Sequence, residues 1–99
     1  MNKVILSGNI CRDIECNKVG KGKNKVSRVW NTIAVRKDSE NTDFIPFTVL
    51  GKSAEILEEY AEKGTKIIIE GRVETYTNDE GHTTISILAN NIELCGGKK

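Results

Sequence analysis

The chain has 99 residues, of which 37% are hydrophobic and 29% charged, and its formal net charge is +1. This length supports one small hydrophobic core, and no apolar run approaches the roughly 20 residues of a membrane-spanning helix, so we expect no membrane association. The three cysteines, Cys11, Cys16 and Cys95, are odd in number and scattered, which argues against a disulfide framework and fits the cytoplasm.

Apolar residues that recur with a period of two predict five strands, because successive side chains of a strand point to opposite faces. Gly8 marks a bend or bulge in the first strand, and residues 11–17 either continue that strand or leave it. A stretch with four lysines at 18–25 and a polar stretch at 37–43 are predicted as loops, and residues 78–81 as a hairpin turn. The strands are expected at residues 3–10, 26–36, 44–50, 66–76 and 82–94.

Residues 53–63 change to a helical period and predict a short amphipathic helix that begins with Ser53 as its N-cap. Ala54, Leu57 and Ala61 form its apolar stripe, which Tyr60 widens, while glutamates occupy the opposite side. The helix carries four Glu and one Lys, a net charge of −3, which leaves +4 for the rest of the chain. If the helix covers one end of the domain, the exposed strand faces and loops are therefore basic.

Three strands, one helix and two strands, in that order, favour a small closed barrel. Five twisted antiparallel strands avoid exposed edges by curling into a Greek-key barrel, with the helix between strands three and four. This all-β arrangement with one short helix is the oligonucleotide/oligosaccharide-binding (OB) fold. We expect the OB domain at residues 1–95 and a short, flexible, basic end at residues 96–99.

The motifs that would support catalysis are incomplete. Gly20-Lys21-Gly22-Lys23 is similar to a phosphate-binding loop, but a strand follows it instead of a helix. Gly51-Lys52-Ser53 does precede a helix, but the first glycine of a P-loop is replaced by Pro46, which has no N–H. A metal site would need the cysteines to converge with His82, and no two of them have CxxC spacing. We therefore expect no enzymatic activity, no metal and no other cofactor.

The outward rows of the strands hold the candidate binding residues. Trp30 stands between Arg28 and Arg36 on its row, which suits base stacking beside phosphate neutralisation. An alternative places Trp30 in an oligomer interface or at the end of the barrel. If the rows share one face, they form the basic and aromatic patch typical of single-strand binding. The candidates on the strands are Arg28, Trp30, Thr32, Arg36, Phe44, Leu50, Arg72 and Tyr76, whereas Phe47 is expected in the core.

Several short motifs follow one another in a specific order between Met1 and about Leu94. They include Met1-Asn2-Lys3-Val4-Ile5-Leu6, Gly8-Asn9, Arg12-Asp13, Asn31-Thr32-Ile33-Ala34-Val35, Val49-Leu50-Gly51-Lys52-Ser53-Ala54-Glu55 and Glu70-Gly71-Arg72. The ordered set resembles the bacterial and phage single-stranded DNA-binding protein (SSB) family. The resemblance implies an OB barrel that assembles, usually as a homotetramer, and binds single-stranded DNA over its outward strand faces without strong sequence preference.

The resemblance also implies roles for single positions. Phe44 and Tyr76 occupy positions at which the family has stacking aromatics. Lysines on the loops and at the start of the helix would contact the DNA backbone; these are Lys21, Lys23 and Lys52.

The sequence departs from the family at other positions. Leu50 stands where Phe or Trp is usual, and Trp30 stands where a small polar residue is usual, so we expect Trp30 to replace a lost stacking position. The family has an acidic tail that recruits replication proteins, and we expect that tail to be absent here, since the sequence ends in Gly96-Gly97-Lys98-Lys99. A truncated chain and a short variant both fit this ending.

The residues and the resemblance together predict a non-catalytic protein that binds single-stranded DNA in replication, recombination and repair. One alternative is an OB-type replication accessory or primosomal protein that acts mainly through protein contacts. The other, a nucleotide-dependent or metal-dependent enzyme, would need a motif that the sequence lacks.

Overall fold

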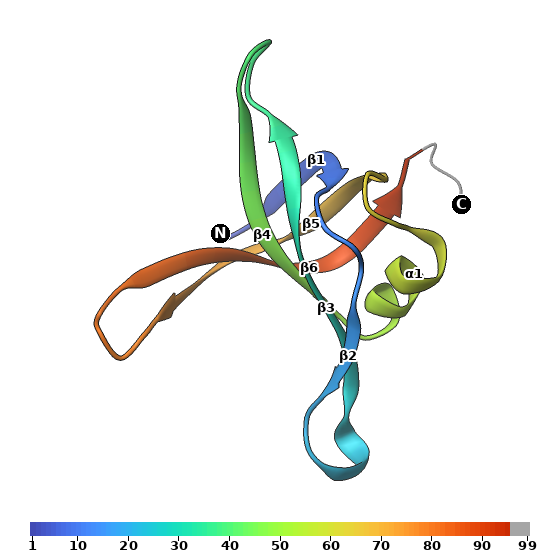
Figure 1. Ribbon diagram of the computed structural model, residues 1–99. Helices are drawn as coiled ribbons and strands as arrows, with labels where there is room; N and C mark the ends of the chain where they lie inside the picture. Colours follow the sequence, from blue (N-terminus) through green and yellow to red (C-terminus); the bar gives the residue numbers. More distant parts are fainter. Residues whose placement is uncertain (96–99) are drawn as a thin grey trace.

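The computed structural model describes residues 1–95 and contains six strands and one α-helix in that range (Figure 1). The helix, α1 (Lys52–Tyr60), follows the fourth strand, and a short 3-10 turn, η1 (Gly22–Asn24), lies between the second and third. The predicted flexible end at residues 96–99 lies outside the described residues. The strands are β1 (Val4–Ile10), β2 (Cys16–Val19), β3 (Val26–Arg36), β4 (Thr42–Leu50), β5 (Lys66–Thr77) and β6 (Thr83–Leu94).

The six strands form one sheet that closes on itself. Their order is β1-β5-β6-β4-β3-β2, and a second pairing of β1 with β3, in which Asn9 faces Ala34 and Ile10 faces Ile33, completes the ring. This arrangement is the expected OB barrel. The expectation of antiparallel strands throughout was wrong at one place, because β4 and β6 pair in parallel. Parallel neighbours need a long crossover, and α1 with β5 supplies it.

The barrel has one strand more than predicted. β2 pairs with the beginning of β3, with Cys16 opposite Val29, and the helix therefore lies between β4 and β5 instead of strands three and four. Lys18, predicted in a loop, belongs to β2, and its ammonium group donates a hydrogen bond to Ser27 (3.0 Å) and lies 4.0 Å from the carboxylate of Glu55 on α1. A lysine at this position interrupts the apolar alternation that would have predicted the strand.

The helix is shorter than predicted and begins one residue earlier. It starts at Lys52, after Gly51 with a φ of 72°, so the predicted N-cap Ser53 lies inside the first turn. It ends at Tyr60 because the chain must turn toward β5, and the N–H of Gly64 in this turn donates to the carbonyl of Ile10 (2.8 Å). The prediction that Tyr60 packs in the apolar stripe was wrong, since its side chain is 54% exposed.

The predicted inward rows of β3, β4 and β5 meet in the core. Phe47, the largest of the fully buried side chains, lies there as expected, and α1 adds Ala54 and Leu57. Burying each large apolar side chain contributes roughly 1.5–3 kcal/mol, so this core supplies the main driving force for folding. The buried hydrophobic residues are Ile10, Val29, Ile33, Phe47, Val49, Ala54, Leu57, Ala61, Ile67, Ile69, Ile87 and Ala89.

The start of β1 is fastened to β5 by polar side chains. The amide of Asn2 donates to the carbonyl of Val73 and accepts from its N–H, both at 2.9 Å. Lys3 forms an ion pair of 2.8 Å with Glu70, and this contact lowers the pKa of the Glu70 carboxyl and raises the pKa of Lys3. The predicted bulge is not at Gly8: the irregularity in the sheet lies between Glu70 and Gly71.

Candidate nucleic-acid interface

The outer face of β3 and β4 carries most of the predicted strand residues. The register places Arg28 opposite Leu50, Thr32 opposite Pro46 and Ala34 opposite Phe44. Directly opposed residues of an antiparallel pair point to the same side of the sheet. Five predicted residues therefore share one surface, namely Arg28, Trp30, Thr32, Phe44 and Leu50.

The same face continues onto β6 and β5. Trp30 is opposite Thr48, Thr48 is opposite Leu88 in the parallel pair, and Leu88 is opposite Arg72. Because neighbouring strands lie about 4.8 Å apart, this row from Trp30 to Arg72 spans roughly 14 Å. Tyr76 stands on the same side of β5 as Arg72, and so the predicted rows do share one face.

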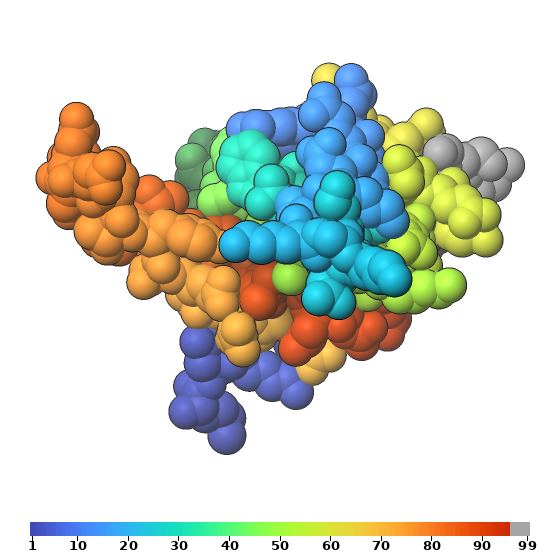
Figure 2. All heavy atoms as spheres, turned by 90° about the horizontal axis from the view of Figure 1, so that it is seen from below, coloured from blue at the N-terminus to red at the C-terminus, as the bar shows by residue number. Residues whose placement is uncertain are grey.

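Three hairpins, β2–β3, β3–β4 and β5–β6, project from the barrel in different directions (Figure 1). Phe44, 67% exposed, lies near the outer end of the β3–β4 hairpin, and Tyr76, 54% exposed, near the tip of the β5–β6 hairpin. In Figure 2 the orange β5–β6 hairpin stands clear of the rest of the molecule. Lys21 and Lys23 flank the tip of the third hairpin, β2–β3, and are therefore not gathered with the aromatic residues.

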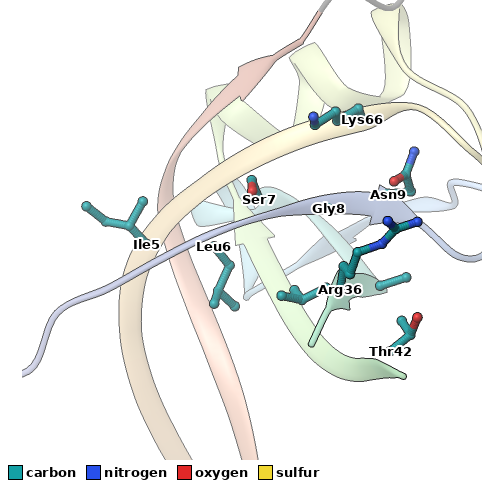
Figure 3. A pocket seen from close by; sticks show the side chains of 10 residues that line it. Ile5, Leu6, Ser7, Gly8, Asn9, Arg36, Thr42 and Lys66 are labelled. Carbon is teal, nitrogen blue, oxygen red and sulfur yellow. The ribbon is translucent and has the colours of Figure 1, made fainter. Parts of the chain in front are cut away.

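Arg36 belongs to the same outward row of β3 as Trp30 but stands at the far end of the strand. It lines a cavity of about 640 Å³ between β1 and the far ends of β3 and β4, and Figure 3 shows its guanidinium directed toward Asn9. Lys66 and Thr42 line the same cavity, and the two charged residues of its lining are both cations. The cavity is thus a positively charged recess beside the β3–β4 hairpin.

The cations of the site differ in their partners. Arg72 donates through two nitrogens to one carboxylate oxygen of Glu74, at 3.2 and 3.0 Å. The two side chains can meet because residues two positions apart in a strand lie on the same face. The charge of Arg72 is therefore partly neutralised before any ligand arrives. Arg28 and Lys52, which begins α1 just after Gly51, take part in none of the ion pairs found within residues 1–95.

Arg12 was not among the predicted residues, yet it contacts the site. Its guanidinium carbon lies 4.9 Å from the centroid of the Trp30 ring, and Trp30 is 50% exposed. Arg12 belongs to the connection between β1 and β2, where no periodic pattern pointed to it. The available signal was Asn31, the single polar member of the apolar row Val29, Asn31, Ile33, because its side chain binds this connection.

The described part of the chain offers neither a metal cluster nor a membrane-crossing helix. Between residues 1 and 95, no three side chains of His, Cys, Asp or Glu gather in a way that could hold a metal ion. Cys11, Cys16 and Cys95 are all free and half-buried. The one helix in that range, α1, is too short and too polar to cross a bilayer.

The closed sheet with its aromatic and basic outer face defines an OB-fold protein with a candidate nucleic-acid interface. The sequence model of the Single-strand binding protein family matches residues 1–95. The chain belongs to this family, which confirms the resemblance seen in its motifs.

Relatives carry the name single-stranded DNA-binding protein. The protein of Wolinella succinogenes is 33% identical over 98% of this chain and 65% of its own length. That of Fusobacterium nucleatum is 36% identical over 95% of this chain and 66% of its own length, and that of Onion yellows phytoplasma is 34% identical over 87% and 84%. The chain thus spans about two thirds of the length of the first two relatives.

Proposed function

We propose that residues 1–95 bind single-stranded DNA without sequence preference and thereby protect and organise it in replication, recombination and repair in the cytoplasm. The main support is the sheet face shared by Trp30, Arg28 and Arg72, with Phe44 and Tyr76 on the hairpins that continue it. Large aromatic side chains on an outward polar row are poorly explained by folding, because at least half of each stays exposed there. The names of the relatives agree with this function.

The proposed binding combines two physical terms. Each base stacked on an aromatic ring contributes roughly 1–3 kcal/mol and needs no particular sequence, since every base has a π-face. The cations neutralise phosphates and release counterions, so the affinity falls as salt rises. Double-stranded DNA keeps its bases stacked inside the helix and cannot use the aromatic residues. No step of this function is catalytic.

A fluorescence titration tests the proposal, because Trp30 is the only tryptophan of the chain. We expect oligo-dT to quench the emission of Trp30, and we expect the quenching to weaken with salt. A duplex of equal length serves as the control and should produce little quenching. Binding without quenching, measured by the anisotropy of a labelled oligonucleotide, would move Trp30 to a protein interface. No binding in either assay would favour the accessory-protein alternative.

We also propose that the chain assembles into a homo-oligomer, with the tetramer of the resembling family as the expected form. Ile5 supports this proposal, because it is 63% exposed on the outer side of β1, near Ile68 of β5. β1 pairs with β3 only at Asn9 and Ile10, so the beginning of its second edge is free of strand pairing within residues 1–95. An unpaired strand edge beside an exposed isoleucine is a feature that a subunit interface covers.

Sedimentation equilibrium measures this assembly directly. The single chain has a mass of 11.0 kDa, and the wild-type protein is expected to sediment as a multiple of that mass. Ile5→Lys places a charge on the proposed interface and should shift the protein toward the monomer. Ile85→Lys, at another exposed isoleucine on β6, is the matched control and should leave the mass unchanged. A wild-type protein that sediments as a monomer would contradict the proposal.

A further inference from the structure

The connection between β1 and β2 is bound to β3 through a buried amide. Asn31 is 0% exposed, and its side-chain oxygen accepts the N–H of Arg12 at 3.2 Å. Its side-chain nitrogen donates to the carbonyl of Arg12 at 3.1 Å and to that of Asp13 at 3.5 Å. The N–H of Cys11 adds a bond to the carbonyl of Thr32 at 2.9 Å. The backbone of Arg12 is therefore held on both its donor and its acceptor.

The attachment of this connection also places the side chain of Arg12 next to Trp30, which lies on the outer side of β3. The connection runs along the edge of β3 that faces away from β4, between the pairings of β3 with β1 and with β2, and it brings Arg12 to the outward ring of Trp30. The guanidinium carbon lies 4.9 Å from the ring centroid, which is the geometry of a cation–π contact. Arg12 thus lies over one face of the indole, while half of Trp30 stays exposed and accessible to a ligand.

The charge of Arg12 is not neutralised by an ion pair within residues 1–95, although Asp13 is its neighbour in sequence. A guanidinium stacked on an aromatic ring keeps N–H groups at its edge, and these suit the oxygens of a phosphate. Arg28, two positions before Trp30 on the same row, adds a second cation to this part of the face.

We propose that Arg12 and Trp30 form one composite nucleotide site, in which a base stacks on the open face of Trp30 and Arg12 contacts the adjoining phosphate from behind the ring. Asn31 is the positioning residue that holds Arg12 there. This inference rests on the proposed function, because it assigns one nucleotide of the bound strand to a specific pair of side chains. It also explains how Trp30 presents a fixed ring from an exposed strand position.

The test measures the affinity of labelled oligo-dT by anisotropy at several salt concentrations. Arg12→Ala is expected to weaken binding about tenfold at low salt and to lower the salt slope by about 0.7, the contribution of one phosphate contact to a single strand. Arg12→Lys keeps the charge but lacks the planar group, so it should restore the slope and only part of the affinity. Lys63→Ala, at an exposed lysine after α1, should change neither quantity.

The outcomes separate this inference from the proposed function. A wild-type protein that fails to bind oligo-dT overturns both. If the wild type binds while Arg12→Ala retains its affinity and slope, the composite site is wrong and single-strand binding stands. Asn31→Ala, checked for folding by circular dichroism, should weaken binding as Arg12→Ala does, and the double variant should lose little more. Independent, multiplying losses would overturn the positioning role of Asn31.

Discussion

A variant in which Trp30, Phe44 and Tyr76 are all changed to alanine is expected to bind single-stranded DNA at least about 100-fold more weakly than the wild type. Each stacked base contributes roughly 1–3 kcal/mol, and each 1.4 kcal/mol is a factor of about ten in affinity. At least half of each of the three residues is exposed, and none of them belongs to the buried core, so their removal should leave the barrel intact. The measurement is the dissociation constant of labelled oligo-dT, accompanied by a thermal melt.

Tyr60 provides a matched control for this variant. Its side chain is 54% exposed, as is that of Tyr76, but it stands at the end of α1 instead of on the hairpins of the sheet. Tyr60→Ala is therefore expected to bind DNA as the wild type does. Equal losses from Tyr60→Ala and Tyr76→Ala would show a general effect of exposed aromatic residues. If the triple variant bound DNA with the affinity of the wild type, the proposed base stacking on these three residues would be wrong.

A large loss of stability is expected from Gly8→Ala. A Cβ atom at this position would lie 2.1 Å from the carbonyl oxygen of Ala34, far inside the contact distance of two such atoms. The carbonyl belongs to the backbone of β3, and a Cβ atom is fixed to the backbone of β1. Relief therefore requires β1 to move away from β3, which breaks the pairs that close the barrel, Asn9 with Ala34 and Ile10 with Ile33. We expect a loss of about 3 kcal/mol or more, at the upper end of the cost of overpacking.

Thermal unfolding followed by circular dichroism measures this effect. For a domain of this size a loss of about 3 kcal/mol lowers Tm by roughly 12–24 °C. Ser7→Ala, at the exposed neighbour in β1, is the control and should change the stability by less than about 0.5 kcal/mol. A Gly8→Ala protein with the wild-type Tm would mean that β1 and β3 do not approach each other as closely as the barrel requires.

The period of two predicted β3 correctly, and β4 from Phe44 onward, because one face of each is buried and the other is not. The predicted loop at 37–43 was too long, since β4 begins at Thr42. The same rule missed β2, where Lys18 stands opposite the buried Ser27 and extends to the carboxylate of Glu55. The parallel pairing of β4 with β6 could not be predicted from local pattern, since it depends on where the chain returns after α1 and β5. Local alternation thus predicts strands better than it predicts their neighbours.

The candidate site shows the same division between local and tertiary information. Trp30 and Phe44 were found because large aromatic residues on an outward row stand out in the sequence. The ion pair of Arg72 with Glu74 could also have been predicted from the sequence, because residues two apart in a strand share a face. Arg12 was missed because it lies in an irregular connection, and only the buried hydrogen bonds of Asn31 bring it to Trp30.

The pairing of the first strand with a late one also governs how the chain folds. Val4 of β1 lies opposite Gly71 of β5, and the early strand β4 lies beside β6, so the ring joins segments that are far apart in sequence. Sheets dominated by such distant contacts fold slowly, in about milliseconds to seconds, because the entropy of closing long loops is lost before the contacts form. During synthesis, β1 therefore has no β5 to pair with until most of the chain has been made. Barrel closure is an event that follows translation of β6.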